Sequence, residues 1–170
     1  MPRRVYPALA FLLALGLAGC GGGGGGVKTE SNRTVRGDGF SFSAPTDWEV
    51  RTSPISILVA PRGDEVTLIG AYSLRTVKFY RPALWPRAAA ELNRKATVLA
   101  VRLHGRVVSS TTTTVAHSRA RQYVFSYAGK RARIIFFYRR RRQYELYCRW
   151  SASQTEPTAC SSLARSFTPA

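Results

Sequence analysis

Acidic residues are scarce in this sequence of 170 residues. Nine Asp and Glu stand against 26 Lys and Arg, which gives a formal net charge of +17 at pH 7. A net charge of this size is informative about partners rather than about the fold. Asp64 and Glu65 are neighbours within a turn-like stretch, so they do not form the facing carboxylate pair that sugar hydrolysis needs. The shortage of acids therefore argues against a glycosidase and favours an anionic partner.

Histidine and cysteine are also scarce. The two histidines are His104 and His117, and neither has ligand spacing with any of the three cysteines, so we expect no metal site. No glycine-rich phosphate loop follows a strand-like run, and we expect no cofactor. These absences predict that the protein is not an enzyme. The alternative is an enzyme whose site the sequence does not reveal.

Long apolar segments are nearly absent. The longest uncharged apolar run covers residues 5–17, and Arg3 and Arg4 precede it. A helix that crosses a bilayer needs about 20 apolar residues, so this run is too short to span a membrane. A basic segment followed by a short apolar run is typical of a secretory signal peptide. We therefore expect residues 1–19 to be a signal peptide that is removed from the mature chain.

The apolar run ends with Leu17-Ala18-Gly19-Cys20, which resembles the lipobox of bacterial lipoproteins at all four positions. The resemblance implies that the chain is cut before Cys20 and that the Cys20 thiol receives diacylglycerol. The expected location is then the extracytoplasmic face of the cell membrane, with the lipid as anchor. An ordinary signal peptide cut near Ala18, with an incidental cysteine, is the alternative. Cleavage before Cys20 removes two arginines and no acid, so the mature chain keeps a formal charge of +15.

Six glycines follow Cys20 directly, and a polar, unpatterned stretch continues to residue 38. Glycine loses the most conformational entropy on ordering, so this stretch is a poor candidate for regular structure. We expect residues 20–38 to form the lipidated cysteine and a flexible tether with a reach of about 25 Å. Residues 39–170 are enough for one globular domain with its own core.

Residues 39–170 contain regular spacings of apolar residues that predict strands and helices in a definite order. Period-two alternation and β-branched residues predict strands, and three- and four-residue spacing of apolar residues predicts helices. The expected strands cover residues 39–43, 55–60, 66–74, 106–115, 119–127, 131–139 and 143–151, and the expected helices cover 86–100 and 158–166. The last four strands follow one another through short turns, which predicts an antiparallel meander.

One strand is apolar on both of its faces. In the run RARIIFFYRR, Ile134 and Phe136 point to one face of the sheet, and Ile135 and Phe137 point to the other. Such a strand belongs in the interior of a sheet that is covered on both sides. The helices at 86–100 and 158–166 are the expected covers. The predicted fold class is therefore α+β, an antiparallel sheet covered by helices on both faces.

Three short motifs carry a resemblance to a known family. The opening FSFSAPTDWEV, the pair YELYC, and AC followed by SSLARSF, together with the order of elements, resemble PsbP-like domains. These are small α/β/α sandwiches that also occur in bacterial lipoproteins. The resemblance implies a non-enzymatic binding or accessory role. It carries over no ligand residues, because no shared site motif is present.

Cys148 and Cys160 are the pair that remains once Cys20 is assigned to the lipobox. An even pair in an exported protein favours a disulfide. A bond that closes the loop of 13 residues from Cys148 to Cys160 would stabilise the fold by about 3 kcal/mol in the chain-entropy model. Two buried free thiols are the alternative.

The basic residues are concentrated in the meander. Ten basic residues and one acid, Glu145, lie between Arg119 and Arg149. The densest group is a run in one hairpin loop, where we expect all four side chains to reach solvent: Arg139, Arg140, Arg141 and Arg142. Aromatic residues lie nearby in the sequence, namely Tyr138, Tyr144, Tyr147 and Trp150. Arginine beside aromatic rings suits phosphates, anionic lipids or nucleic acid, and the alternative is a solvated surface.

These features predict a membrane-anchored envelope lipoprotein with a non-enzymatic binding or accessory domain. The expected partners are anionic lipids, wall polymers or another envelope protein, and nucleic acid is not expected. The competing hypothesis is an envelope enzyme, which a buried pocket bearing a carboxylate would favour over a shallow basic surface.

Overall fold

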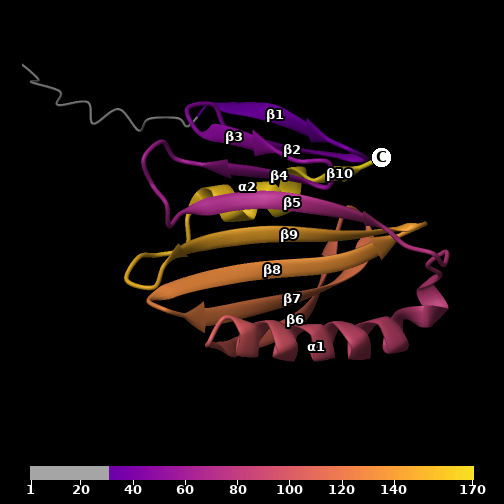
Figure 1. Cartoon of the computed structure of the whole chain (residues 1–170). Helices are drawn as coiled ribbons and strands as arrows, with labels where there is room; N and C mark the ends of the chain where they lie inside the picture. The colour runs from indigo at the N-terminus through magenta and orange to yellow at the C-terminus, as the bar shows by residue number, and fades with distance from the viewer. Residues whose placement is uncertain (1–30) are drawn as a thin grey trace, which may run out of the picture.

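The computed structural model of the chain describes residues 31–170 (Figure 1). The predicted signal peptide and Cys20 lie outside the described residues. Within residues 31–170, no helix is both long and apolar enough to cross a membrane.

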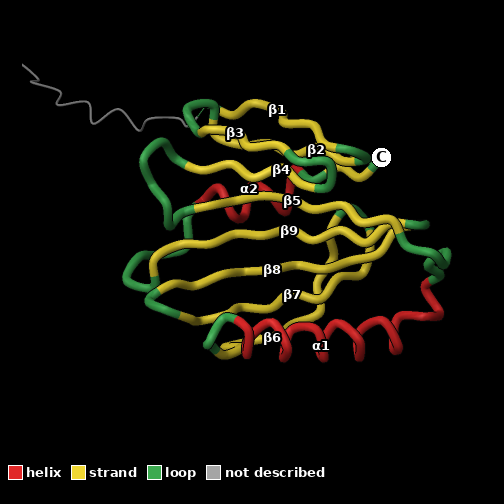
Figure 2. Tube along the Cα trace, in the orientation of Figure 1, coloured by secondary structure: helices red, strands yellow, loops and turns green. Residues whose placement is uncertain are grey.

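The described part of the chain folds into ten strands, two α-helices and one short 3₁₀ helix (Figure 2). In chain order they are β1 (Asn32–Gly37), β2 (Phe40–Pro45), β3 (Glu49–Thr52), β4 (Ser56–Ala60), β5 (Leu68–Arg75), η1 (Pro82–Leu84), α1 (Trp85–Arg102), β6 (Arg106–Val115), β7 (Ser118–Tyr127), β8 (Lys130–Arg139), β9 (Arg142–Ser151), α2 (Thr158–Ser166) and β10 (Thr168–Pro169). The four strands of the predicted meander are confirmed to within one residue at each end.

The strands form two antiparallel sheets. The large sheet has the order β3-β4-β5-β9-β8-β7-β6, and the small sheet has the order β1-β2-β10. The turns of the meander are tight because their residues adopt positive φ, as at Ala116 and His117 between β6 and β7 and at Ala128 and Gly129 between β7 and β8. Two successive residues with positive φ match the right-handed twist of the flanking strands.

The strand β8 is buried on both faces, as its sequence predicted. Ile134 and Phe136 pack with Leu92 and Ala96 of α1 in one core. The helix α1 turns its buried side toward β6 and β7 along the lower side of the large sheet in Figure 1. Pro86 suits its first turn because a proline there removes no intrahelical hydrogen bond.

The opposite face of the large sheet has a mixed cover. Ile135 and Phe137 share a second core with Leu163 of α2 and Phe42 of β2. The small sheet and α2 therefore lie on this face together, and the expectation that helices cover both faces of the sheet is not confirmed. The sequence did not reveal the small sheet because β1 buries only Val35 and pairs with β2 through its backbone.

The strand β1 also changes the predicted domain boundary. Residues 32–37 lie inside the range assigned to the tether, so the tether prediction is wrong for these residues. Their polar side chains are mostly exposed, which explains why their sequence shows no strand pattern. The earlier part of the predicted tether, residues 20–30, lies outside the described residues.

The predicted disulfide is confirmed between Cys148 of β9 and Cys160 of α2, whose Cα atoms are 5.5 Å apart. Both residues are buried in the core that holds α2 against the sheet. The bond therefore ties the last helix covalently to a central strand.

We expect the double variant Cys148→Ala/Cys160→Ala to lose about 3 kcal/mol of unfolding free energy, because the unfolded chain regains the entropy that the closed loop removes. Urea unfolding of the mature chain carrying Cys20→Ser, with and without the two further changes, measures this loss. Two thiols that react with an alkylating reagent in the folded, non-reduced protein would contradict the bond.

Candidate functional site

The run of four arginines forms the tip of the β8–β9 hairpin. Arg139 and Arg142 pair across the ladder, so Arg140 and Arg141 make a two-residue turn. Arg140 has a φ of 54°, and the side chains of Arg140 and Arg141 are exposed. We call residues 139–142 the arginine hairpin. It lies at the right end of the sheet in Figure 1.

Arg142 is a structural residue of this hairpin. Its Nη1 donates to Ser73 Oγ at 2.7 Å and to Asp38 Oδ2 at 3.1 Å, and its side chain is only 19% exposed. The hydrogen bond from Arg142, followed by its charge, lowers the pKa of the Asp38 carboxyl. The expectation that all four arginines reach solvent is therefore wrong for Arg142, which joins the turn after β1 to the large sheet.

Gly39 makes this contact possible. Its φ is 79°, and a Cβ at this position would lie 2.7 Å from Cζ of Arg142. Its carbonyl also accepts a hydrogen bond from the Tyr144 hydroxyl at 3.1 Å. A residue with a side chain would thus strain the backbone and push the guanidinium away from Asp38.

Two neighbouring segments are attached to the arginine hairpin. In the loop of residues 76–81, the Thr76 amide donates to the Arg141 carbonyl at 2.8 Å, and the Tyr80 amide donates to the Arg140 carbonyl at 2.7 Å. In the β6–β7 turn, the Ala116 carbonyl accepts from Arg139 Nη1 at 3.5 Å. We call the arginine hairpin, the loop of residues 76–81 and the β6–β7 turn together the arginine end.

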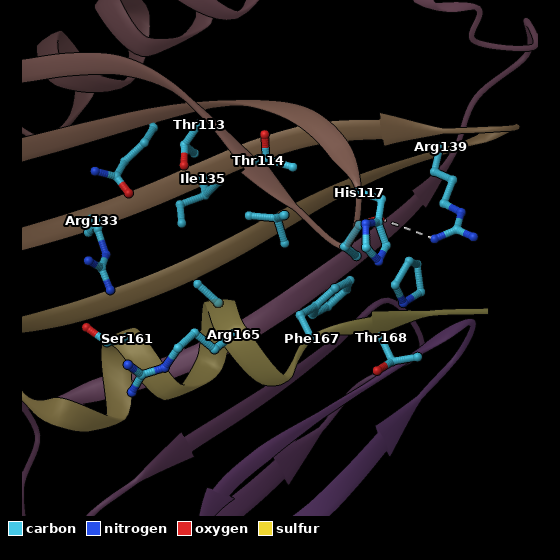
Figure 3. Close-up of a pocket in the computed structure, with 15 residues that line it drawn as sticks. Thr113, Thr114, His117, Arg133, Ile135, Arg139, Ser161, Arg165, Phe167 and Thr168 are labelled. Atoms are coloured by element: carbon cyan, nitrogen blue, oxygen red, sulfur yellow. Dashed lines mark hydrogen bonds between the residues drawn. The ribbon is translucent and has the colours of Figure 1, made fainter.

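Three open cavities meet at Arg139, with volumes of about 740, 500 and 390 Å³. None of the three linings contains Asp or Glu. The largest lies between the β6–β7 hairpin and α2, and Figure 3 shows its basic and hydroxyl side chains facing the same space. Those side chains include Thr113, His117, Arg133, Arg139, Ser161 and Arg165.

One guanidinium of the largest cavity is already paired. Nη2 of Arg133 lies 2.7 Å from Oε1 of Glu156, and the Arg133 side chain is 15% exposed. Burial lowers the pKa of Arg133, and the charge of Glu156 opposes that effect. The free positive charge of this cavity therefore rests on Arg139 and Arg165.

The other two cavities combine arginines with aromatic rings. The second is lined by Arg75, Phe79 and the arginine hairpin, and the third by Tyr80, Trp85 and Tyr138 among others. Tyr80 stacks on Tyr138 with ring centroids 5.4 Å apart. Of the predicted aromatic neighbours, Tyr138 and Tyr144 line these cavities. Trp150 instead lies in the core, and Tyr147 pairs with the Tyr127 hydroxyl.

A separate cavity of about 390 Å³ beside α1 is lined by a half-buried carboxylate, Glu145 of β9. Burial raises the pKa of Glu145 to about 7, and the nearby charge of Lys95 lowers it in part. Lys95 Nζ itself donates to Gln143 Oε1 at 3.4 Å. The lining contains no His, Cys, Ser, Thr or Asp. In the sequence Glu145 is visible as the one acid among the ten basic residues of the meander, and an acid in the middle of an interior strand is the signal that could have marked it as half-buried.

The two histidines stay apart, at the end of α1 and in the β6–β7 turn. Within residues 31–170, no three His, Cys, Asp or Glu side chains are grouped as a metal site would require.

Comparison with known proteins identifies the fold. No protein-family model and no curated protein matches the sequence. The fold is similar to the solution structure of cyanobacterial PsbP (CyanoP) from Synechocystis sp. PCC 6803, with a TM-score of 0.64 and 10% identity over 91% of this chain and 99% of that one. It is also similar to a crystal structure from Bacteroides thetaiotaomicron VPI-5482, with a TM-score of 0.52 and 9% identity over 82% of this chain and 48% of that one. Identities this low show the fold alone, and a PsbP-like domain is thereby supported.

The pKa of Glu145 predicts a specific dependence of stability on pH. Because the folded-state pKa of about 7 exceeds the ordinary value of 4.5, the folded protein binds the proton more tightly than the unfolded chain. The contribution of protonated Glu145 to the free energy of unfolding is complete below pH 4.5, and it is lost as the pH rises through 7. The loss amounts to at most about 3 kcal/mol.

Glu145→Gln should remove this dependence and unfold with a higher free energy than the wild type at about pH 8. Urea unfolding of both proteins between about pH 4 and pH 8 gives the difference, in which other titrating groups cancel. A constant difference across that range would show that burial does not shift the pKa.

Proposed function

We propose that this protein is a membrane-anchored envelope lipoprotein whose PsbP-like domain is a non-enzymatic binding module for an anionic surface. The observation that carries the proposal is the arginine end, where three cavities meet at Arg139 without an acid in their linings. The similarity to a solved PsbP structure supports the fold of the module and does not identify its ligand.

The exposed part of the arginine end has the chemistry of an anion-binding surface. Arg140 and Arg141 extend from a turn whose backbone is held by two hydrogen bonds from residues 76–81. Guanidinium groups bind phosphate and carboxylate oxygens in a bidentate manner. Each basic side chain contributes about 1 kcal/mol near an anionic bilayer, and the effect fades within about 8 Å at physiological salt. The open cavities suit a surface or a polymer better than an enclosed small molecule.

The position of β1 is compatible with contact between the arginine end and the membrane that holds the proposed anchor. The strand begins at Asn32 and ends beside Asp38, which Arg142 binds. A six-residue strand spans about 20 Å. The arginine end touches the same membrane only if the segment between the proposed anchor and Asn32 covers about this distance.

An envelope enzyme that uses Glu145 as a general base is the second candidate. A carboxylate with a pKa of about 7 is suited to proton transfer near neutral pH. The cavity around Glu145, however, has no hydroxyl, thiol, imidazole or second carboxylate in its lining. A single isolated base does not make a catalytic constellation, and we rank the binding module first.

Arg140→Ser/Arg141→Ser should weaken binding of the mature, lipid-free protein to anionic vesicles or polyphosphate by about thirtyfold, because two exposed charges are removed and each contributes about 1 kcal/mol. Binding of the wild type should fall as salt rises. Vesicle sedimentation at several salt concentrations measures both effects.

Arg62→Ser/Arg131→Ser is the matched control, since it removes the same charge from exposed positions outside the arginine end. This control should bind like the wild type. Equal binding by both double variants, or binding indifferent to salt, would make the arginine hairpin an ordinary solvated surface.

The anchor has its own test. Cys20→Ser in the full chain should abolish incorporation of radiolabelled fatty acid and leave the signal peptide uncleaved. Labelling and gel mobility of cell fractions report both changes. A Cys20→Ser chain that is processed and fractionates like the wild type would contradict the lipoprotein assignment.

A further inference from the structure

The loop of residues 76–81 presents apolar side chains to solvent at the arginine end. Val77 is 97% exposed and Phe79 is 52% exposed. A single exposed apolar residue is normal on a protein surface. These two residues, which we call the apolar tip, flank Lys78 in a loop between the strand β5 and η1.

The apolar tip is surrounded by positive charge. The segment from Arg75 to Arg81 contains three basic residues and no acid. Phe79 lines the same cavity as Arg140 and Arg141. Exposed apolar groups with basic residues around them are the pattern by which proteins lie at the interface of an anionic membrane.

The loop is held in place while its apolar side chains stay exposed. Its two ends are fixed by the backbone hydrogen bonds that Thr76 and Tyr80 donate to the arginine hairpin, at 2.8 and 2.7 Å. The Thr76 hydroxyl also donates to the Lys78 carbonyl at 2.8 Å, which closes the loop on itself. Tyr80 stacks on Tyr138, so its ring packs onto the domain. A loop fixed in this way loses little entropy when it contacts a surface.

We propose that Val77 and Phe79 insert into the boundary between headgroups and acyl chains of an anionic bilayer, while the surrounding basic residues bind its headgroups. This inference rests on the proposed function and names the anionic surface as a lipid bilayer. A wall polymer or polyphosphate has charges but no apolar phase, so it would leave the apolar tip in water. Of these three anionic surfaces, the bilayer is the one that uses both properties of the loop.

The test compares two probes with the mature chain carrying Cys20→Ser. The probes are vesicles with equal parts of phosphatidylcholine and phosphatidylglycerol, and polyphosphate. Val77→Ser/Phe79→Ser should bind the vesicles about tenfold more weakly, since interfacial binding scales with buried apolar area. Its binding to polyphosphate should equal that of the wild type, because no charge has changed.

Val101→Ser/Val108→Ser is the matched control. These residues are 70% and 48% exposed on α1 and β6, outside the arginine end, and their variant should bind both probes like the wild type. Circular dichroism of each variant confirms the fold. As a second readout, the fluorescence of Phe79→Trp should be quenched by brominated acyl chains in the vesicles.

The outcomes separate the two proposals. Vesicle binding that is unchanged in Val77→Ser/Phe79→Ser but lost in Arg140→Ser/Arg141→Ser would overturn insertion and leave the anionic site intact. Binding of the wild type to polyphosphate but not to the vesicles would also overturn insertion and leave the anionic site intact. Failure of the wild type to bind either probe would overturn the proposed function itself.

Discussion

The strand β8 sets the constraint on which the rest of this structure depends. Its centre is apolar on both faces, so each face needs its own cover. The helix α1 buries one face, and α2 together with the small sheet buries the other. Both faces of β8 are therefore committed to a core, and the turns at the ends of the large sheet remain available to a ligand. The densest run of arginines lies in one of these turns, between β8 and β9.

The arginine hairpin contains two kinds of arginine, which only the structure separates. Arg142 is bound by Asp38 and Ser73, so its charge holds the turn between β1 and β2 against the large sheet. Arg140 and Arg141 have exposed side chains on a backbone that the loop of residues 76–81 fixes. One arginine therefore orders the site, and its neighbours are left to bind. Because Arg142 is already paired, the cluster offers fewer free positive charges to a ligand than its sequence suggests.

The sequence predicts those parts of the fold that depend on local pattern. The meander, both helices and the disulfide follow from periodicity and from an even cysteine pair. The strand β1 could not be predicted, because only Val35 of its side chains is buried and its pairing is a backbone property. The role of Arg142 depends on Asp38, more than a hundred residues away. The exposure of Val77 and Phe79 likewise depends on how their loop is attached, which no local pattern records.

Amide hydrogen exchange of the mature, lipid-free domain, with and without anionic vesicles, tests the central claim most directly, because it locates the contact without any substitution. The account predicts that vesicles protect residues 76–81 and the arginine hairpin and leave the cavity around Glu145 unchanged. Protection centred on Glu145 and α1, or spread evenly over the domain, would contradict a binding site at the arginine end.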